Sequence, residues 1–430
     1  MQTLSTTQAD FWQHLDEATQ HASEAAFDQE TQHLHDLVRD QGDAALLELT
    51  RRWDHLEAPS VSELEVPRSD WQQALDTLPA EQTAALRLAQ QRITAYAEHQ
   101  RLQGWQTTDE LGVTYGEIIR PVDRAGVYAP GGRAAYASTV LMNVIPARVA
   151  GVEEIIVCSP APHGQRHQAV LAACALAGAH RLFTLGGAQA ILAMGLGTAT
   201  VPRCDVVVGP GNRHVVAAKR LLAGTVGIDS LAGPSEVTLI ADDSALPERL
   251  AWDLLAQAEH DEAARCVLIS PSAALLDATC ELLHTLSRGL PRLAIAEQAL
   301  ARHGLLIHCR DLSEAVALAN HLAPEHLGLA VAQPESLLDA VRHAGTVVLG
   351  HHACEALSDY LAGPNHVLPT AGAARHSSPL GVYVFQKRSS VLAASPQAAA
   401  ALAPPGAILA RTEGLEAHAR ALEARRGKPA

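Results

Sequence analysis

Apolar and polar residues follow two different periods along the chain. Over about residues 8–100 apolar residues recur at three- and four-residue spacing, as in Leu34, Leu37 and Val38, which predicts amphipathic helices. Beyond about residue 120, short aliphatic runs alternate with helix-like stretches, and small-residue turns follow the runs. This alternation is typical of βαβ units around a parallel sheet.

The aliphatic runs form two series on either side of Pro234. The first series comprises residues 126–128, 154–158, 181–185 and 205–208. The second comprises residues 237–241, 266–269, 305–308, 327–331 and 346–349. We therefore expect two α/β domains, and the corner Ala232-Gly233-Pro234-Ser235 between them is a candidate hinge.

The pattern predicts an α/β fold with two Rossmann-like, doubly wound parallel-sheet domains, an α-rich N-terminal region and a helical C-terminal tail. Residues 1–120 are expected to pack on the second α/β domain, and residues 121–234 and 235–385 to form the two domains. Residues 386–430 are expected to form the C-terminal tail. In this tail, Pro404-Pro405-Gly406 predicts a break before a helix from about Thr412 to Arg426.

Composition narrows the classes of function. The chain has 430 residues, enough for more than one core, and only 3% aromatic residues, which favours helices on aliphatic strands. A net charge of -15 argues against nucleic acid and anionic lipid as partners. Seven cysteines without a CxxC pair indicate reduced thiols rather than a disulfide frame or a cysteine-bound zinc. No signal peptide and no membrane-spanning apolar run is visible, so we expect a soluble, cytoplasmic protein.

Three expected strand ends lead into glycine corners: Ala129-Pro130-Gly131-Gly132, Gly186-Gly187-Ala188-Gln189 and Gly209-Pro210-Gly211-Asn212. In an open parallel sheet such corners can hold a nucleotide against helix N-termini. None of them has the full G-x-G-x-x-G spacing, however. Each glycine can equally well close an ordinary turn between strand and helix.

A candidate metal site lies in the expected helix over residues 250–264. Gln257 and His260 are three residues apart and continue its apolar stripe, so they share one helix face. The pair could also be a hydrogen-bonded core histidine and its neighbour, because it lacks the H-E-x-x-H spacing. Zinc would need a further histidine and a carboxylate, which spacing cannot choose among 22 histidines.

A candidate acid-base pair, Glu325 and His326, stands directly before the expected strand at residues 327–331. Pro324 restricts the backbone there. Histidine is the usual proton acceptor near neutral pH, and a neighbouring glutamate can activate a water. An exposed loop is the alternative interpretation.

Together these segments resemble the histidinol dehydrogenase family from roughly Asp123 to Arg425. The resemblance rests on long blocks in a fixed order. They include Tyr128-Ala129-Pro130-Gly131-Gly132, Gly227-Ile228-Asp229, Gln257-Ala258-Glu259-His260-Asp261, Pro324-Glu325-His326-Leu327, Gly363-Pro364-Asn365-His366 and Glu413-Gly414-Leu415.

The resemblance implies a zinc- and NAD-dependent oxidation of L-histidinol through L-histidinal to L-histidine, the last step of histidine biosynthesis. It implies one zinc per subunit, held by Gln257, His260, Asp359 and His418. Catalysis is then assigned to Glu325 and His326. The substrate would contact Ser235, His326, His366, Glu413 and the four metal ligands. NAD would contact Tyr128, Gln189 and Asn212. The enzyme would be an intertwined homodimer, with residues 386–430 as its dimerisation tail.

Some positions depart from the family pattern, among them His214, Cys354, His376 and Pro379, but none removes an implied ligand. A related zinc and NAD dehydrogenase acting on another amino or hydroxy alcohol is the first alternative. A metal-dependent hydrolase that uses Glu325 without a nucleotide is the second, and a noncatalytic interaction protein is the third. Formation of NADH would separate the dehydrogenases from the other two.

Overall fold

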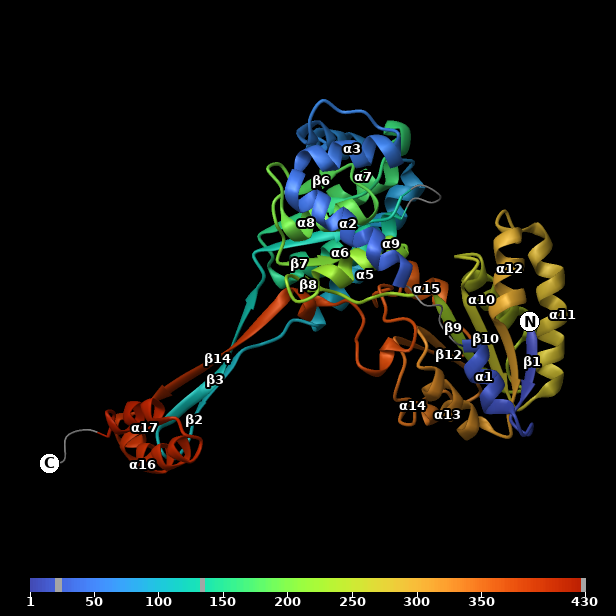
Figure 1. The fold of residues 1–430 in the computed structure, drawn as a ribbon. Helices are drawn as coiled ribbons and strands as arrows, with labels where there is room; N and C mark the ends of the chain where they lie inside the picture. The colour runs from blue at the N-terminus through green and yellow to red at the C-terminus, as the bar shows by residue number, and fades with distance from the viewer. Residues whose placement is uncertain (20–24, 132–135, 427–430) are drawn as a thin grey trace. The chain divides into compact units, whose positions relative to one another are not determined.

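The computed structural model describes residues 1–19, 25–131 and 136–426 (Figure 1). The chain divides into two compact units. The first contains Met1–Gln100 and Asp123–Phe385, and the second contains Arg101–Val122 and Gln386–Ala430. No helix among the described residues is long and apolar enough to cross a membrane.

The first unit contains a five-stranded parallel sheet in the order β6-β5-β4-β7-β8. Its strands are β4 (Arg124–Tyr128), β5 (Glu154–Cys158), β6 (Arg181–Phe183), β7 (Val206–Val208) and β8 (Gly227–Ile228). The connecting helices are α6 (Ala137–Ala150), α7 (Gln168–Ala177), α8 (Gly187–Leu196) and α9 (Arg213–Leu222). The strand order reverses between β4 and β7, which is where open α/β sheets bind ligands.

A second, six-stranded parallel sheet has the order β1-β11-β10-β9-β12-β13. Its strands are β1 (Gln2–Ser5), β9 (Glu236–Ala241), β10 (Arg265–Ser270), β11 (Gly304–His308), β12 (His326–Ala330) and β13 (Thr346–Leu349). The main helices are α10 (Pro247–Ala258), α11 (Ala273–Leu286), α12 (Leu293–His303) and α13 (Leu312–Leu322), and two short ones follow, α14 (Glu335–Leu338) and α15 (Glu355–Tyr360). Apart from β1, the strands of this sheet have the same order as those of the first sheet, 3-2-1-4-5 when they are numbered along the chain within each sheet.

Both sheets confirm the expected α/β class with two doubly wound parallel-sheet domains. Strands such as β9 are buried along their whole length because helices cover both faces of the sheet. This is why the central strands stand out in the sequence as short, continuous aliphatic runs.

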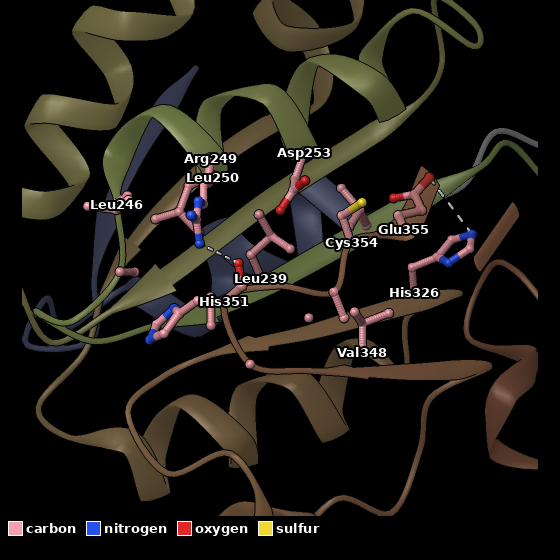
Figure 2. Close-up of a pocket in the computed structure, with 16 residues that line it drawn as sticks. Leu239, Leu246, Arg249, Leu250, Asp253, His326, Val348, His351, Cys354 and Glu355 are labelled. Atoms are coloured by element: carbon pink, nitrogen blue, oxygen red, sulfur yellow. Dashed lines mark hydrogen bonds and ion pairs between the residues drawn. The ribbon is translucent and has the colours of Figure 1, made fainter. Parts of the chain in front are cut away.

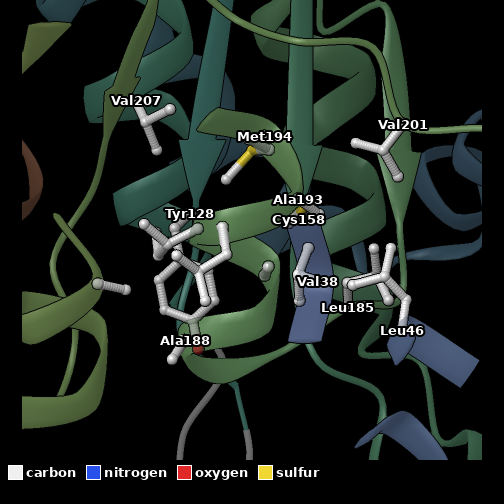
Figure 3. Packing of buried hydrophobic residues seen from close by; sticks show 14 of the residues in the cluster. Val38, Leu46, Tyr128, Cys158, Leu185, Ala188, Ala193, Met194, Val201 and Val207 are labelled. Atoms are coloured by element: carbon white, nitrogen blue, oxygen red, sulfur yellow. The ribbon is translucent and has the colours of Figure 1, made fainter. Parts of the chain in front are cut away.

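The N-terminal residues divide between the two sheets, so the expected packing of residues 1–120 on the second domain is wrong for most of the region. Only β1 and α1 (Phe11–Thr19) join the second sheet, where Phe11 and Leu15 enter its core. Helices α2 (Ala25–Gln41), α3 (Asp43–Asp54), α4 (Arg68–Thr77) and α5 (Ala80–His99) pack instead on α6–α9. Val38 and Leu46 lie in one cluster with Tyr128 and Leu185 (Figure 3). An amphipathic pattern shows which helix face is buried but not which core receives it.

The second unit is a three-stranded antiparallel sheet with two helices. Its strands β2 (Trp105–Thr108), β3 (Val113–Pro121) and β14 (Gln386–Ala394) have the order β14-β3-β2 (Figure 1). Residues 101–120, expected in the N-terminal region, therefore pair with the start of the expected tail. Helix α16 (Pro396–Thr412) packs against α17 (Glu416–Glu423) through Ala407, Ala410 and Ala419.

Two expected helix boundaries are wrong. Helix α16 continues through Pro404 and Pro405, because packing of its alanine face on α17 outweighs the two lost backbone hydrogen bonds. The expected helix over residues 250–264 ends at Ala258. His260 therefore lies just beyond α10, although its amide still donates to the carbonyl of Gln257 at 3.2 Å.

Candidate active site

Glu325 and His326 lie at the amino end of β12, both almost completely buried. Ala323 and Pro324 connect α13 to these two residues, and Ala323 lies in the left-handed region at φ 48°. Glu325 Oε2 accepts a hydrogen bond of 2.9 Å from the amide of Glu236, the first residue of β9. The two side chains are thus fixed at the amino edge of the second sheet, opposite to the edge where such sheets usually bind ligands.

The imidazole of His326 lies between two carboxylates. Its Nε2 is 3.9 Å from Glu325 Oε1 and 3.9 Å from Glu355 Oε1. Burial lowers the pKa of His326 to about 3, with the charges of His366 and His260 acting in the same direction. Burial also raises the pKa of Glu325 well above its usual range. Burial raises the pKa of Glu355 in the same way. His326 is therefore neutral, and the ionised form of either carboxyl group would stabilise the imidazolium that forms when His326 accepts a proton.

A cluster of metal-binding type adjoins this pair. His260, Glu355 and Asp359 offer ligand atoms that all lie within 4.8 Å of one another. Glu355 begins α15 and Asp359 stands near its end, one helical turn away, so that both face the same point. Asp359 Oδ1 is buried and has no hydrogen-bond partner among the described residues.

The amide of Gln257 is completely buried beside Glu355. Its oxygen faces the carboxylate oxygens of Glu355, and this contact is unfavourable because all of these atoms are hydrogen-bond acceptors. Turning the amide relieves this, with a nitrogen contact to Glu355 Oε2 of 3.0 Å and acceptance from the Glu236 amide at 3.2 Å. A cation between the oxygens would relieve it too. The oxygen and nitrogen donors of Gln257, His260, Glu355 and Asp359 therefore fit a zinc ion.

His366 and Ser235 border the same region. His366 Nδ1 is 2.9 Å from the carbonyl oxygen of Asp359, and its Nε2 is 3.3 Å from Thr139 Oγ1 at the start of α6. Burial lowers the pKa of His366 to about 4, so the ring is neutral. Ser235 is partly buried directly before β9, and its carbonyl accepts from the amide of Arg265 at 3.0 Å.

A narrow pocket with a volume of about 30 Å³ runs from this site along the second sheet (Figure 2). His326 and Glu355 line one end, and Leu246, Arg249 and His351 line the other (Figure 2). Gly328 and Ala330 of β12 line the pocket, and Gly328 is packed so closely that a Cβ there would lie 2.6 Å from Leu239 Cδ2. The pocket thus lies between the sheet and α10 and ends at His326.

The residues expected to contact NAD gather at the carboxyl edge of the first sheet. Tyr128 ends β4, and its hydroxyl oxygen accepts from the Gly187 amide at 3.0 Å. Gln189, in the first turn of α8, is buried with Oε1 unpartnered among the described residues. Asn212 caps α9 by accepting from the amides of His214 and Val215, which leaves its NH₂ group for a ligand. Gly132, in the first glycine corner, lies outside the described residues.

His418 and Glu413 belong to the second unit. His418 lies in α17 and Glu413 follows α16, and both side chains are exposed. The chain's own metal cluster thus contains two of the four expected zinc ligands, His260 and Asp359, with Gln257 beside it.

Sequence reasoning missed Glu355 as a candidate ligand. Its place four residues before Asp359 was the available signal, since that spacing puts two carboxylates on one face of a helix. It also missed Thr139, whose contact with His366 joins positions 227 residues apart.

Comparison with known proteins places this site in a family. The family model described as histidinol dehydrogenase matches residues 17–426. A histidinol dehydrogenase of Nitrosomonas europaea is 52% identical, over 92% of this chain and 91% of the relative. One from Methylococcus capsulatus is 49% identical, over 98% and 97%. The crystal structure of histidinol dehydrogenase from Elizabethkingia anophelis has a TM-score of 0.93 at 33% identity, covering 99% of this chain and 98% of that one.

The protein is therefore an oxidoreductase of the dehydrogenase type. More specifically, the chain belongs to the histidinol dehydrogenase family.

Proposed function

We propose that this protein oxidises L-histidinol through L-histidinal to L-histidine, with zinc and two molecules of NAD, as the last step of histidine biosynthesis. The observation that carries the proposal is the arrangement of the buried His326 between Glu325 and Glu355, next to the ligand cluster of His260 and Asp359. An acid-base pair beside a cation site suits the oxidation of an alcohol that also carries nitrogen ligands.

Zinc would be held by Gln257, His260 and Asp359 together with His418, and Glu355 stands close enough to join them. When bound, the zinc supplies a positive charge that orients the substrate's nitrogens, and NAD, bound by Tyr128, Gln189 and Asn212, supplies the hydride acceptor. Ser235, His366 and Glu413 would complete the contacts to histidinol.

The residues of the chain divide the proton transfers. His326 accepts the hydroxyl proton of histidinol, and the neighbouring carboxylates stabilise its charged form. Glu325 then accepts a proton from the water that adds to the aldehyde, since its buried carboxylate is a stronger base than a solvated one. His326 acts again when the hydrate is oxidised. Two successive oxidations thus use one pair of residues.

The functional enzyme would be a homodimer formed through the second unit. Both faces of its sheet carry exposed residues, and Leu392, Ile408 and Leu409 are 76%, 66% and 66% exposed. A small sheet is stable only when one face is covered, so a second copy of the chain would suit this surface.

The test is NADH formation on adding L-histidinol to the purified, zinc-loaded protein, with the product identified and counted. Two NADH and one L-histidine per histidinol are expected. Chelation should abolish the activity and zinc should restore it, while the fold persists because its cores are large without the metal. Absence of NADH from the zinc-loaded protein, or full activity in protein shown to be metal-free, would contradict the proposal.

A further inference from the structure

Asp54 is a buried carboxylate that the proposed function does not use. It is the last residue of α3, only 8% exposed, and its Oδ2 has no hydrogen-bond partner among the described residues. The C-terminal end of a helix disfavours a negative charge, because the free carbonyl groups there are themselves negative. Burial without a partner is costly as well. Packing alone gives no reason for an aspartate at this position.

The side chain of Asp54 faces the carboxyl edge of the first sheet. A Cβ at Gly186 would lie 3.4 Å from Asp54 Oδ1 and 2.6 Å from Pro160 Cβ. Pro160 follows β5, and Gly186 follows β6 and caps α8. The charge of Asp54 also acts on the hydroxyl of Tyr128, at the end of β4. The carboxylate therefore lies where the ends of three adjacent strands meet.

This position has a counterpart in dinucleotide-binding sheets of the same strand order. There an acidic side chain near the second strand binds the ribose of the adenosine half, one strand away from the corner that holds the pyrophosphate. Here β5 is that second strand, but Ser159 and Pro160 follow it, neither of which is acidic. The carboxylate at this place comes from α3 instead.

We propose that Asp54 binds the adenosine ribose of the dinucleotide cofactor through its vicinal hydroxyls and so selects NAD over NADP. The inference rests on the proposed NAD-linked function. A carboxylate accepts hydrogen bonds from both hydroxyls of an unmodified ribose. The 2′-phosphate of NADP would be repelled by the negative charge of Asp54. An aspartate also cannot supply the positive charge that an arginine offers to this phosphate in NADP-binding proteins. The unpartnered oxygens of Asp54 and Gln189 mark two places on the edge where a ligand would complete the hydrogen bonding.

Asp54→Asn tests the inference, because the amide has the same size but neither charge nor two acceptors. Binding of NADH and NADPH is measured by fluorescence titration without substrate, so that the readout does not depend on turnover. The affinity for NADH should fall about 10- to 100-fold, the value of a hydrogen bond to a charged group. The preference for NADH over NADPH should fall by at least as much. Asp43→Asn is the matched control, since Asp43 stands at the other end of α3 and bonds to Thr200.

Each outcome decides the matter. Unchanged NADH affinity in a folded Asp54→Asn variant would mean that the carboxylate is structural and would overturn the inference. So would weaker binding of both nucleotides with an unchanged ratio. If the unsubstituted protein bound neither NADH nor NADPH, both the inference and the proposed function would be wrong. If it binds NADH and the variant binds equally well, only the role of Asp54 is wrong.

Discussion

Four of the eight unpartnered buried side-chain atoms among the described residues lie in the two candidate functional regions. His326 Nδ1 and Asp359 Oδ1 lie at the candidate active site, and Gln189 Oε1 and Asp54 Oδ2 lie at the carboxyl edge of the first sheet, the proposed NAD site. Each such atom costs free energy in the folded protein. A ligand that completes their hydrogen bonds or coordination would remove the cost, which ties both regions to binding.

The two halves of the reaction can be separated at Glu325. Glu325→Gln keeps the size of the side chain but cannot accept a proton from water. Oxidation of histidinal should fall about 10²- to 10⁴-fold, the usual effect of losing a general base. The first oxidation should change far less. His326→Asn should slow both, and single-turnover NADH formation from histidinol and from histidinal measures each half.

Equal losses in both halves for Glu325→Gln would show that this division of roles is wrong. Because the Oε2 of Glu325 accepts from the Glu236 amide, thermal unfolding of the variant is the control for a loss of structure.

The stability of the protein should depend on pH through Asp54. Burial raises its pKa from 3.8 to about 6, and the nearby His55 opposes this. Between these values the folded protein keeps a proton that the unfolded chain has released, so stability is lost as the pH rises through this range. The full penalty above the folded pKa is up to about 3 kcal/mol. Asp54→Asn cannot titrate and should escape it.

The measurement is the difference in unfolding temperature between Asp54→Asn and the unsubstituted protein at about pH 4 and pH 7. The variant's advantage should grow with pH, while contributions from all other groups cancel in the difference. The titratable groups that act on Asp54 or respond to it are His55 and Tyr128. A difference that does not change with pH would refute the assignment.

At the scale of elements, a buried ion pair holds the corner between β7 and α9. Lys219 Nζ donates to the carbonyl of Gly209 at 2.5 Å and lies 2.5 Å from Asp229 Oδ1. Asp229 Oδ2 in turn accepts from the amide of Gly209 at 2.8 Å. Both side chains are 3% exposed. The corner that carries Asn212 is thus fixed from both sides by one pair of charges.

Lys219→Met should destabilise the protein by about 3–5 kcal/mol, because it leaves Asp229 buried without a counter-charge. The double variant Lys219→Met/Asp229→Asn should recover much of this loss, since no uncompensated charge remains. Chemical unfolding of the two single variants, the double variant and the unsubstituted protein gives the coupling energy. Additive losses would show that the two charges do not depend on each other.

The strands of this protein could be predicted from sequence more closely than the helix ends. The aliphatic run at residues 154–158 is β5 without change, because all of its residues but the first are buried and a buried parallel strand is apolar. The end of α10 at Ala258 and the passage of α16 through two prolines depend on tertiary packing and not on local preference. The three-residue spacing of Gln257 and His260 correctly predicted that the two residues lie close together. Only Gln257 is part of the helix, however.

At the scale of the whole molecule, the sequence did not show which distant segments meet. β14 pairs with β3 although Gln386 and its partner Pro121 are separated by most of the chain. Only the fold shows that Glu355 lies beside His260 and that Asp54 lies beside Gly186. Periodicity reports the environment of a residue but not the identity of its neighbours. The resemblance supplied site residues that spacing alone left open.

Subunit mixing tests whether an active site is built from two chains. His418 lies in the second unit, whose core is formed by the small residues Ala407, Ala410 and Ala419. Such a core is too small to be stable alone, which favours packing against a second copy. If His418 completes the partner's site, mixing His418→Ala with His326→Ala subunits should regenerate about one normal site per heterodimer, because a single site can then receive both intact residues. Activity should rise from near zero in either homodimer toward about half the normal value in purified heterodimers. Heterodimers shown by mass to have formed, yet without activity, would mean that each site draws on one chain only.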